Sequence, residues 1–352
     1  DEAHYLTQER FNTDFNKIKT ERKYFFTATT KETTSDRGLG MNNEEFYGES
    51  IFIMTPFEAI QLGKMVRPRV HIVSTNGNKV MTKEDLDKSL DKLVMNAFTK
   101  HSKQLKNNQK GKMLVAASGT DDMKRLIQSD EIQNFINRGG KFFAVASDSD
   151  VSNYINGKKV NRRDWLKQLQ TDGGDKNQEL IVVHFDILTE GIDVPGLTGV
   201  LFLRDLKKSK FIQTFGRVAR LDKQDRKNLE DKKITSNDLD KMNKPYAWII
   251  IPAVKAEDTD KLANLENLTE ALRDTGFDPK EDIEPYDRAE GGKKEDDEEI
   301  VPGDNSISGL VGQVVENYNH KIEEERVANL TFSQRMDEEE NRGKNNSEEF
   351  DF

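Results

Sequence analysis

Short runs of apolar, β-branched and aromatic residues recur along most of the chain and constrain its fold more than any other feature. These runs occupy residues 24–26, 50–54, 70–73, 113–117, 142–145, 180–183, 200–203 and 247–251. Several are apolar throughout and do not alternate with polar residues, which is typical of strands buried on both faces of a parallel sheet. The runs therefore predict a buried sheet.

Amphipathic segments separate the runs. In residues 83–105, apolar side chains recur at spacings of three and four, which predicts one long helix. Residues 121–137 repeat this pattern and stop at Arg138-Gly139-Gly140, a sequence that ends helices. Strand, helix and strand in this order predict an α/β fold.

The pattern changes near Pro252. A helix is expected through Leu262, Leu265, Leu268 and Leu272, followed by the acidic stretch 291–299 and an amphipathic segment, 307–330. The acidic stretch and the tail after it have too little apolar surface to offset the entropy lost on ordering. We expect them to be disordered or weakly ordered, with the tail a possible docking site for a protein partner.

Charge and cysteine content exclude several classes of protein. The net charge is −10, from 54 basic and 64 acidic residues, so any contact with nucleic acid must come from a local basic patch. The absence of cysteine excludes disulfides, thiolate zinc sites and cysteine nucleophiles. No apolar run approaches the roughly 20 residues of a membrane helix. We expect a cytoplasmic protein that does not bind membranes.

Four short motifs occur in a fixed order along this pattern. They are Asp1-Glu2-Ala3-His4, Thr27-Ala28-Thr29, Thr189-Glu190-Gly191-Ile192-Asp193-Val194-Pro195 and Gln213-Thr214-Phe215-Gly216-Arg217-Val218-Ala219-Arg220. Together they resemble motifs II, III, V and VI of the superfamily 2 DEAD/DEAH-box helicases, in particular the restriction-type and repair-type branch. The resemblance implies a RecA-like fold, with ATP and Mg²⁺ as cofactors and nucleic acid as partner.

The resemblance also divides the chain into three parts. Residues 1–62 are expected to be a remnant of the first RecA-like lobe, residues 63–252 the second lobe, and residues 253–352 a helical, partly disordered acidic extension. A Gly-Lys-Thr or Gly-Lys-Ser phosphate loop does not occur in this sequence, and in the family it precedes the Asp-Glu-Ala-His motif. We therefore expect the chain to be a C-terminal part of a longer enzyme and to be inactive alone.

The resemblance assigns catalytic roles to residues of the first and the last of the four motifs. Asp1 would hold Mg²⁺ and Glu2 would activate the attacking water. Arg217 and Arg220, three apart and expected on one helical face, would act as arginine fingers on the γ-phosphate. Gln213 opens their motif. A solvated chain end and a solvated basic face are the ordinary alternatives for these residues.

The remaining nucleotide-side residues are assigned by the same resemblance. Asp193 would contact the ribose or the facing lobe, and the nucleotide-binding set also includes Gly191, Gly216 and His4. Asp193 alternatively closes a turn. Gly216 would allow a close approach of the backbone.

Coupling and nucleic-acid contacts form the last group. Thr27 and Thr29 would link the metal site to nucleic acid near His4, and Thr189 and Glu190 would lie near the nucleic-acid backbone. The candidate phosphate contacts are Ser118, Arg162, Arg163 and Lys208, for which a plain solvated surface is the alternative. Gln213, where RNA-dedicated DEAD-box enzymes have histidine, favours DNA over RNA.

The sequence thus predicts the C-terminal part of an ATP-dependent DNA helicase or translocase. One alternative is the motor subunit of a type I or type III restriction system. Another is that this chain, as it stands, is a non-catalytic nucleic-acid-binding module.

Overall fold

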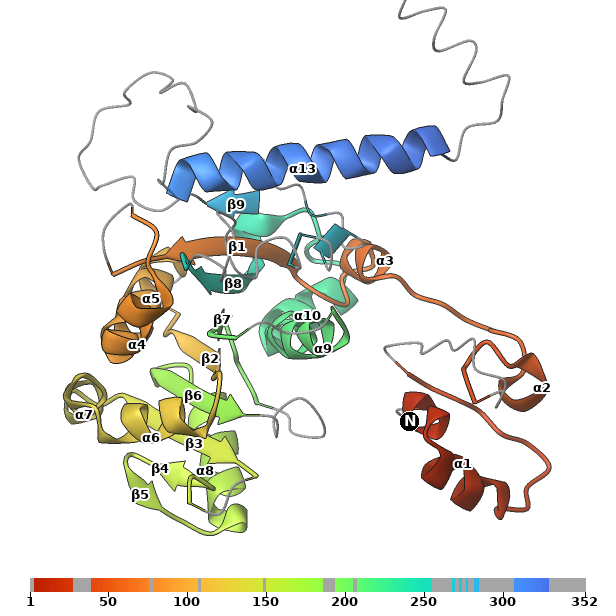
Figure 1. Ribbon diagram of the computed structural model, residues 1–352, viewed down its shortest axis with the longest axis horizontal. Helices are drawn as coiled ribbons and strands as arrows, with labels where there is room; N and C mark the ends of the chain where they lie inside the picture. Colours follow the sequence, from red (N-terminus) through yellow and green to blue (C-terminus); the bar gives the residue numbers. More distant parts are fainter. Residues whose placement is uncertain are drawn as a thin grey trace, which may run out of the picture.

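The computed structural model describes most of the chain and all of the central sheet. The described residues are 3–27, 39–75, 79–106, 109–147, 150–185, 194–204, 208–254, 268–269, 272–273, 277, 282–284 and 307–328. Their first elements are η1 (Ala3–Thr7), α1 (Glu9–Asn16), α2 (Glu44–Tyr47) and α3 (Pro56–Gln61). In Figure 1, α1 and α2 lie to one side of the sheet, and the chain joins the sheet through α3.

A sheet of nine strands organises the described residues, in the order β5-β4-β3-β6-β2-β7-β8-β1-β9. The strands are β1 (Arg67–Val73), β2 (Lys112–Ala116), β3 (Lys141–Ala146), β4 (Tyr154–Ile155), β5 (Lys158–Lys159), β6 (Leu180–Phe185), β7 (Gly199–Phe202), β8 (Tyr246–Pro252) and β9 (Ile283–Glu284). All neighbours pair in parallel except β3 with β4 and β4 with β5. The mostly parallel sheet confirms the predicted α/β class.

Helices cover both faces of this sheet. They are α4 (Lys83–Lys88), α5 (Leu90–Gln104), α6 (Thr120–Gln128), α7 (Asp130–Asn137), α8 (Arg162–Gly174), α9 (Lys208–Val218), α10 (Lys223–Glu230), η2 (Leu239–Lys241) and α13 (Ile307–Ala328). The helices α5, α6 and α7 share one apolar cluster with the sheet, and α8 and α9 share the other. Two covered faces explain why the strands are apolar throughout.

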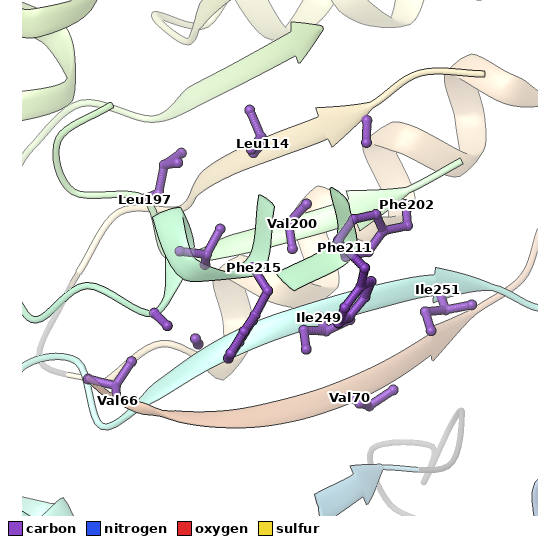
Figure 2. Packing of buried hydrophobic residues seen from close by; sticks show 14 of the residues in the cluster. Val66, Val70, Leu114, Leu197, Val200, Phe202, Phe211, Phe215, Ile249 and Ile251 are labelled. Atoms are coloured by element: carbon purple, nitrogen blue, oxygen red, sulfur yellow. The ribbon is translucent and has the colours of Figure 1, made fainter. Parts of the chain in front are cut away.

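Successive residues of each strand point to opposite clusters. In β2, Leu114 and Ala116 belong to the cluster under α9, whereas Met113 and Val115 belong to the cluster under α5. Figure 2 shows Phe211 and Phe215 of α9 directed at the strands that carry Val200 and Ile249. The sheet therefore holds α9 in a fixed position.

Two of the predicted strands do not form. Residues 24–26 and 50–54 are irregular, and neither pairs with a strand among the described residues. Most of their apolar side chains stay exposed, with Tyr24 at 64% and Ile51 at 85%, whereas Phe25 is partly buried against other aromatic rings. An apolar run becomes a strand only where neighbouring strands satisfy its backbone, and here the described residues supply none.

Each of the two predicted long helices is split at a serine. Residues 83–105 form α4 and α5, which meet at Ser89, and residues 121–137 belong to α6 and α7, which meet at Ser129. The Ser129 hydroxyl accepts from Ile132 N at 3.4 Å and donates to Asp91 at 2.9 Å. A cap of this kind ends one helix and starts the next.

Part of the C-terminal extension packs on the sheet. Ile283 of β9 pairs with Val70 of β1, and Ile307, at the start of α13, is fully buried in the α9-side cluster. In Figure 1, α13 runs beside β9. The acidic stretch 291–299 and the tail from residue 329 lie outside the described residues, as does most of the helix expected before residue 272.

None of the described helices, α13 included, is both long and apolar enough to span a bilayer.

Candidate functional site

The helix α9 carries the last of the four motifs and presents two different faces. Phe211, Phe215 and Val218 are buried, and the ring of Phe211 lies 4.8 Å from that of Phe202 on β7. Gln213 and Arg217 are only partly buried and lie one helical turn apart on the other face.

Gly216 lies on the same outer face of α9. A Cβ atom added there would meet no described heavy atom within 4 Å. The described part of the protein therefore leaves open space at this position, as the close approach of a ligand requires.

Arg220 lies beyond the end of α9, so the expectation that Arg217 and Arg220 share one helical face is wrong. The helix ends at Val218, and Arg220 forms an isolated antiparallel bridge with Met65. Ala219 O accepts from Val66 N at 2.9 Å. These backbone contacts with the segment before β1 compete with another helical turn. Arg220 itself is exposed.

Lys244 caps the carboxyl end of α9. Its buried ammonium group donates to Val218 O and, at 2.6 Å, to Arg220 O. Burial lowers the pKa of Lys244 to about 7, against the opposing effect of the nearby carboxylates of Asp222 and Asp225. Lysine side chains commonly bind the unpaired carbonyls at helix ends.

Asp225, in α10, fixes the backbone that carries Lys244. Its fully buried carboxylate accepts from Asn243 N and Lys244 N, both at 2.8 Å. Burial raises the pKa of Asp225, and these two hydrogen bonds oppose the rise. Asp222 caps α10 through Gln224 N at 2.8 Å and also accepts from the Asn243 side chain at 3.2 Å.

The first two motifs meet in the N-terminal segment. His4 is buried, and its Nδ1 lies 2.9 Å from the Thr27 hydroxyl, while Ala3 N donates to Phe26 O at 2.9 Å. The structure therefore brings His4 and Thr27 together. Asp1, Glu2 and Thr29 lie outside the described residues, so the assigned roles of the acidic pair remain predictions.

The third motif falls largely outside the described residues, which resume at Val194. Thr189, Glu190, Gly191 and Asp193 are in the part not described. Val194 is buried, and a Cβ on Gly173 at the end of α8 would lie 2.9 Å from Pro195 O. The chain after Asp193 therefore packs tightly against α8.

The candidate phosphate contacts gather at the opposite edge of the sheet from Arg220. Ser118 follows the carboxyl end of β2 and hydrogen-bonds to Asp122. Arg162 and Arg163 begin α8, and Lys208 begins α9. Helices that connect parallel strands start at the carboxyl edge and return to the amino edge. Ser118 and these three basic residues thus share the carboxyl edge, whereas Arg220 lies at the amino edge.

The two arginines of α8 differ in their surroundings. Arg163 is exposed, whereas the guanidinium of Arg162 lies 5.6 Å from the Trp165 ring and donates to Asn153 Oδ1 at 3.4 Å. Arg162 is therefore held in place, and Arg163 is free to reach a ligand.

Buried polar residues that no sequence motif marks hold the backbone around this site, and Lys244 and Asp225 are examples. Elsewhere in the sheet, the Nε2 of His101 lies 2.7 Å from the Thr198 hydroxyl. Burial lowers the pKa of His101 to about 3, which keeps the ring neutral. The described residues contain no group of three or more His, Asp or Glu side chains that could hold a metal ion.

No protein-family model and no curated protein matches the sequence. Solved structures do match. One is an ATP-dependent type ISP restriction-modification enzyme, LlaBIII, bound to DNA, with 17% identity and a TM-score of 0.48 over 78% of this chain and 20% of that one. At this identity the likeness concerns the fold alone.

Two further matches are of the same kind. A fragment of a putative HsdR subunit of a type I restriction enzyme from Vibrio vulnificus YJ016 has 17% identity and a TM-score of 0.38, over 60% of this chain and 36% of that one. Domain 2 of the DEAD-box helicase Mss116p, bound to an RNA duplex, has 14% identity and a TM-score of 0.31, over 60% and 70%. The chain thus spans only a minor part of LlaBIII and of the HsdR fragment.

Proposed function

We propose that this chain is the second lobe, with adjoining segments, of an ATP-dependent DNA helicase or translocase. One observation carries the proposal. Gln213 and Arg217 lie on the outer face of α9, and Arg220 follows where the helix meets the segment before β1. In a two-lobed motor, that segment connects the lobes, so the arginines would lie beside the cleft.

The arginine pair suits a nucleoside triphosphate. Guanidinium groups bind phosphate oxygens through paired hydrogen bonds, and the exposed Arg220 and the open space at Gly216 leave room for such a ligand. ATP, when bound with Mg²⁺, would supply the phosphoanhydride bond whose hydrolysis drives the motor. Arg217 and Arg220 would bind the phosphates and stabilise charge that develops on them. The predicted Mg²⁺ contact, Asp1, and the water-activating Glu2 belong to the same proposal.

Nucleic acid would bind along the carboxyl edge of the sheet. Ser118, Arg163 and Lys208 would contact phosphates there without reading sequence. Thr27, held beside His4, would connect this surface to the nucleotide site. DNA is the preferred substrate class because Gln213 replaces the histidine found in RNA-dedicated enzymes.

The test is turnover of ATP by the full-length enzyme. We expect Arg217→Ala and Arg220→Ala to lower kcat about 10³-fold or more, the usual effect of losing an arginine finger. Arg226→Ala is the matched control, because it removes the same charge from an exposed position on the next helix. Losses below tenfold in both test variants would overturn the arginine assignment.

The chain alone is expected to lack ATPase activity, because its sequence has no Gly-Lys-Thr/Ser loop to bind the triphosphate. Magnesium-dependent phosphate release that nucleic acid stimulates would contradict this expectation. Measurable binding of the same chain to DNA without hydrolysis would fit the alternative of a non-catalytic binding module equally well. Turnover by the full-length enzyme separates the two.

The sequence from Tyr47 to Val70 resembles the interlobe region of the restriction-type and repair-type branch, so the motor subunit of a type I or type III restriction system is the alternative to a helicase. A restriction motor tracks along duplex DNA without separating its strands. Displacement of a third strand from a triplex, without unwinding of a forked duplex, would favour the restriction motor. Unwinding of the fork would favour the helicase, and parallel DNA and RNA forks would settle the substrate class.

A further inference from the structure

Three consecutive carbonyl groups at the end of α9 have partners from two different parts of the chain. Val218 O and Arg220 O accept from the Lys244 ammonium group, and Ala219 O, between them, accepts from Val66 N at 2.9 Å. The last carbonyls of a helix have no partners within the helix. Here they join the turn that carries Arg220 both to the segment before β1 and to the start of β8.

Lys244 is held too firmly to adapt to a moving turn. It is 4% exposed, and its own backbone N–H is bound by the buried carboxylate of Asp225. Asp222 and Asp225 together bind the side chain and the backbone of Asn243, the preceding residue. The ammonium group is therefore a fixed point against which the α9 terminus is placed.

A second buried lysine, Lys112, caps a helix that carries neither Arg217 nor Arg220. Lys112, 5% exposed, donates to Gly173 O and to Asp175 O, the latter at 2.7 Å, at the end of α8. A buried lysine that caps a helix is thus a device this fold uses twice. The α9 cap differs because its helix carries Arg217 and the turn after it carries Arg220. It also differs because the carbonyl between its two acceptors binds the segment before β1.

We propose that Lys244 is a positioning residue for Arg217 and Arg220, and that it locks their turn to Val66 in the segment before β1. This inference rests on the proposed function. A change in the direction of that segment would move the Ala219 peptide group, and the fixed Lys244 would convert this movement into a reorientation of Arg220. In a two-lobed motor, lobe closure would in this way set the arginine geometry directly.

The first test is hydrogen exchange in the present chain. Lys244→Met keeps the length and most of the volume of the side chain but removes its donors. We expect the Val66 amide to exchange at least tenfold faster, with the amides of β2 and β6 unchanged. Lys112→Met is the matched control, for which Val66 should exchange at the wild-type rate. Equal protection of Val66 in all three proteins would overturn the proposed lock.

The second test is the ATPase of the full-length enzyme. A misplacement of about 1 Å can cost about 10²-fold in rate, so we expect Lys244→Met to lower kcat tenfold to a hundredfold with KM for ATP unchanged. Lys112→Met should leave both constants near their wild-type values. A Lys244→Met kcat within twofold of wild type would overturn the positioning role.

A milder variant covers the case in which Lys244→Met does not fold. Asp225→Asn keeps Lys244 but places an amide NH₂ against one of two backbone N–H groups, and it should lower kcat by a smaller factor, again at constant KM. If Arg217→Ala and Arg220→Ala leave turnover intact, the proposed function fails, while Val66 exchange still reports on the lock. The two failures are therefore distinguishable.

Discussion

Two apolar runs of this protein differ in structure, because one is a buried strand and the other is irregular and exposed. Residues 180–183 form part of β6, where Ile181 is fully buried between Met113 of β2 and Phe142 of β3. Residues 51–54 are irregular, and Ile53 is 73% exposed. Both runs are apolar throughout and contain β-branched residues, so intrinsic preference does not explain the difference. Strand pairing on both sides does, because it satisfies the backbone and covers the side chains together.

Replacement of Ile181 or Ile53 by alanine should show the largest difference in stability between the two runs. We expect Ile181→Ala to lower the free energy of unfolding by about 3 kcal/mol, since it leaves a cavity in a packed core. Ile53→Ala should change it by less than about 0.5 kcal/mol. Urea denaturation of both variants measures the difference. A large loss at Ile53 would show that this run is buried in solution.

Two truncations test how far the sheet's cooperative unit extends. Removing all residues after Asp278 deletes the buried Ile283 and Ile307 and should cost about 3 kcal/mol of stability. Removing only residues 329–352 should leave the unfolding midpoint unchanged, because α13 remains.

The shorter deletion also tests whether the charge of the tail affects DNA binding. Tighter DNA binding at low salt would indicate that its carboxylates compete with phosphates.

Buried Lys244 predicts that the free energy of unfolding depends on pH. Because the pKa of Lys244 is lowered to about 7, the unfolded chain binds a proton between about pH 7 and 10.5 that the folded chain lacks. Stability should therefore rise with pH across this window, by at most about 1.4 kcal/mol per pH unit. Lys244→Met should flatten the rise. An unchanged slope would contradict the lowered pKa.

The smallest expected effect comes from two matching helix caps. Thr55 caps α3 and Thr82 caps α4, and each forms a reciprocal pair with the acidic residue three positions later. We expect about 1 kcal/mol of destabilisation from either Thr→Ala change. If Thr55→Ala leaves the unfolding midpoint unchanged while Thr82→Ala lowers it, α3 folds independently of the sheet.

The sequence was sufficient for features that depend on local pattern. Six apolar runs correctly predicted β1, β2, β3, β6, β7 and β8. Features that depend on distant residues were missed or wrong. The breaks at Ser89 and Ser129 are examples, since Ser129 binds Asp91, 38 residues away. A serine within a helical pattern does not by itself reveal such a partner.

The buried polar residues could not be predicted from the sequence, because their partners are also distant along the chain. Lys244 binds carbonyls 24 and 26 residues before it, and His101 meets Thr198 across 97 residues. Lys244 belongs to no periodic pattern or motif, and His101 is a polar residue on the otherwise apolar buried face of α5. In a sequence with 54 lysines and arginines, nothing marks one lysine as buried.

The two outermost strands in the sheet order have a consequence for association between molecules. A long open edge strand invites strand addition from another chain, and repeated addition leads to polymers. One end of this sheet is the two-residue β5, whose Lys158 and Lys159 are exposed and charged, and the other is the equally short β9. Neither offers enough unpaired backbone to template a further strand. The two outermost described strands are thus poor templates for strand addition, although the interior strands are among the most apolar parts of the chain.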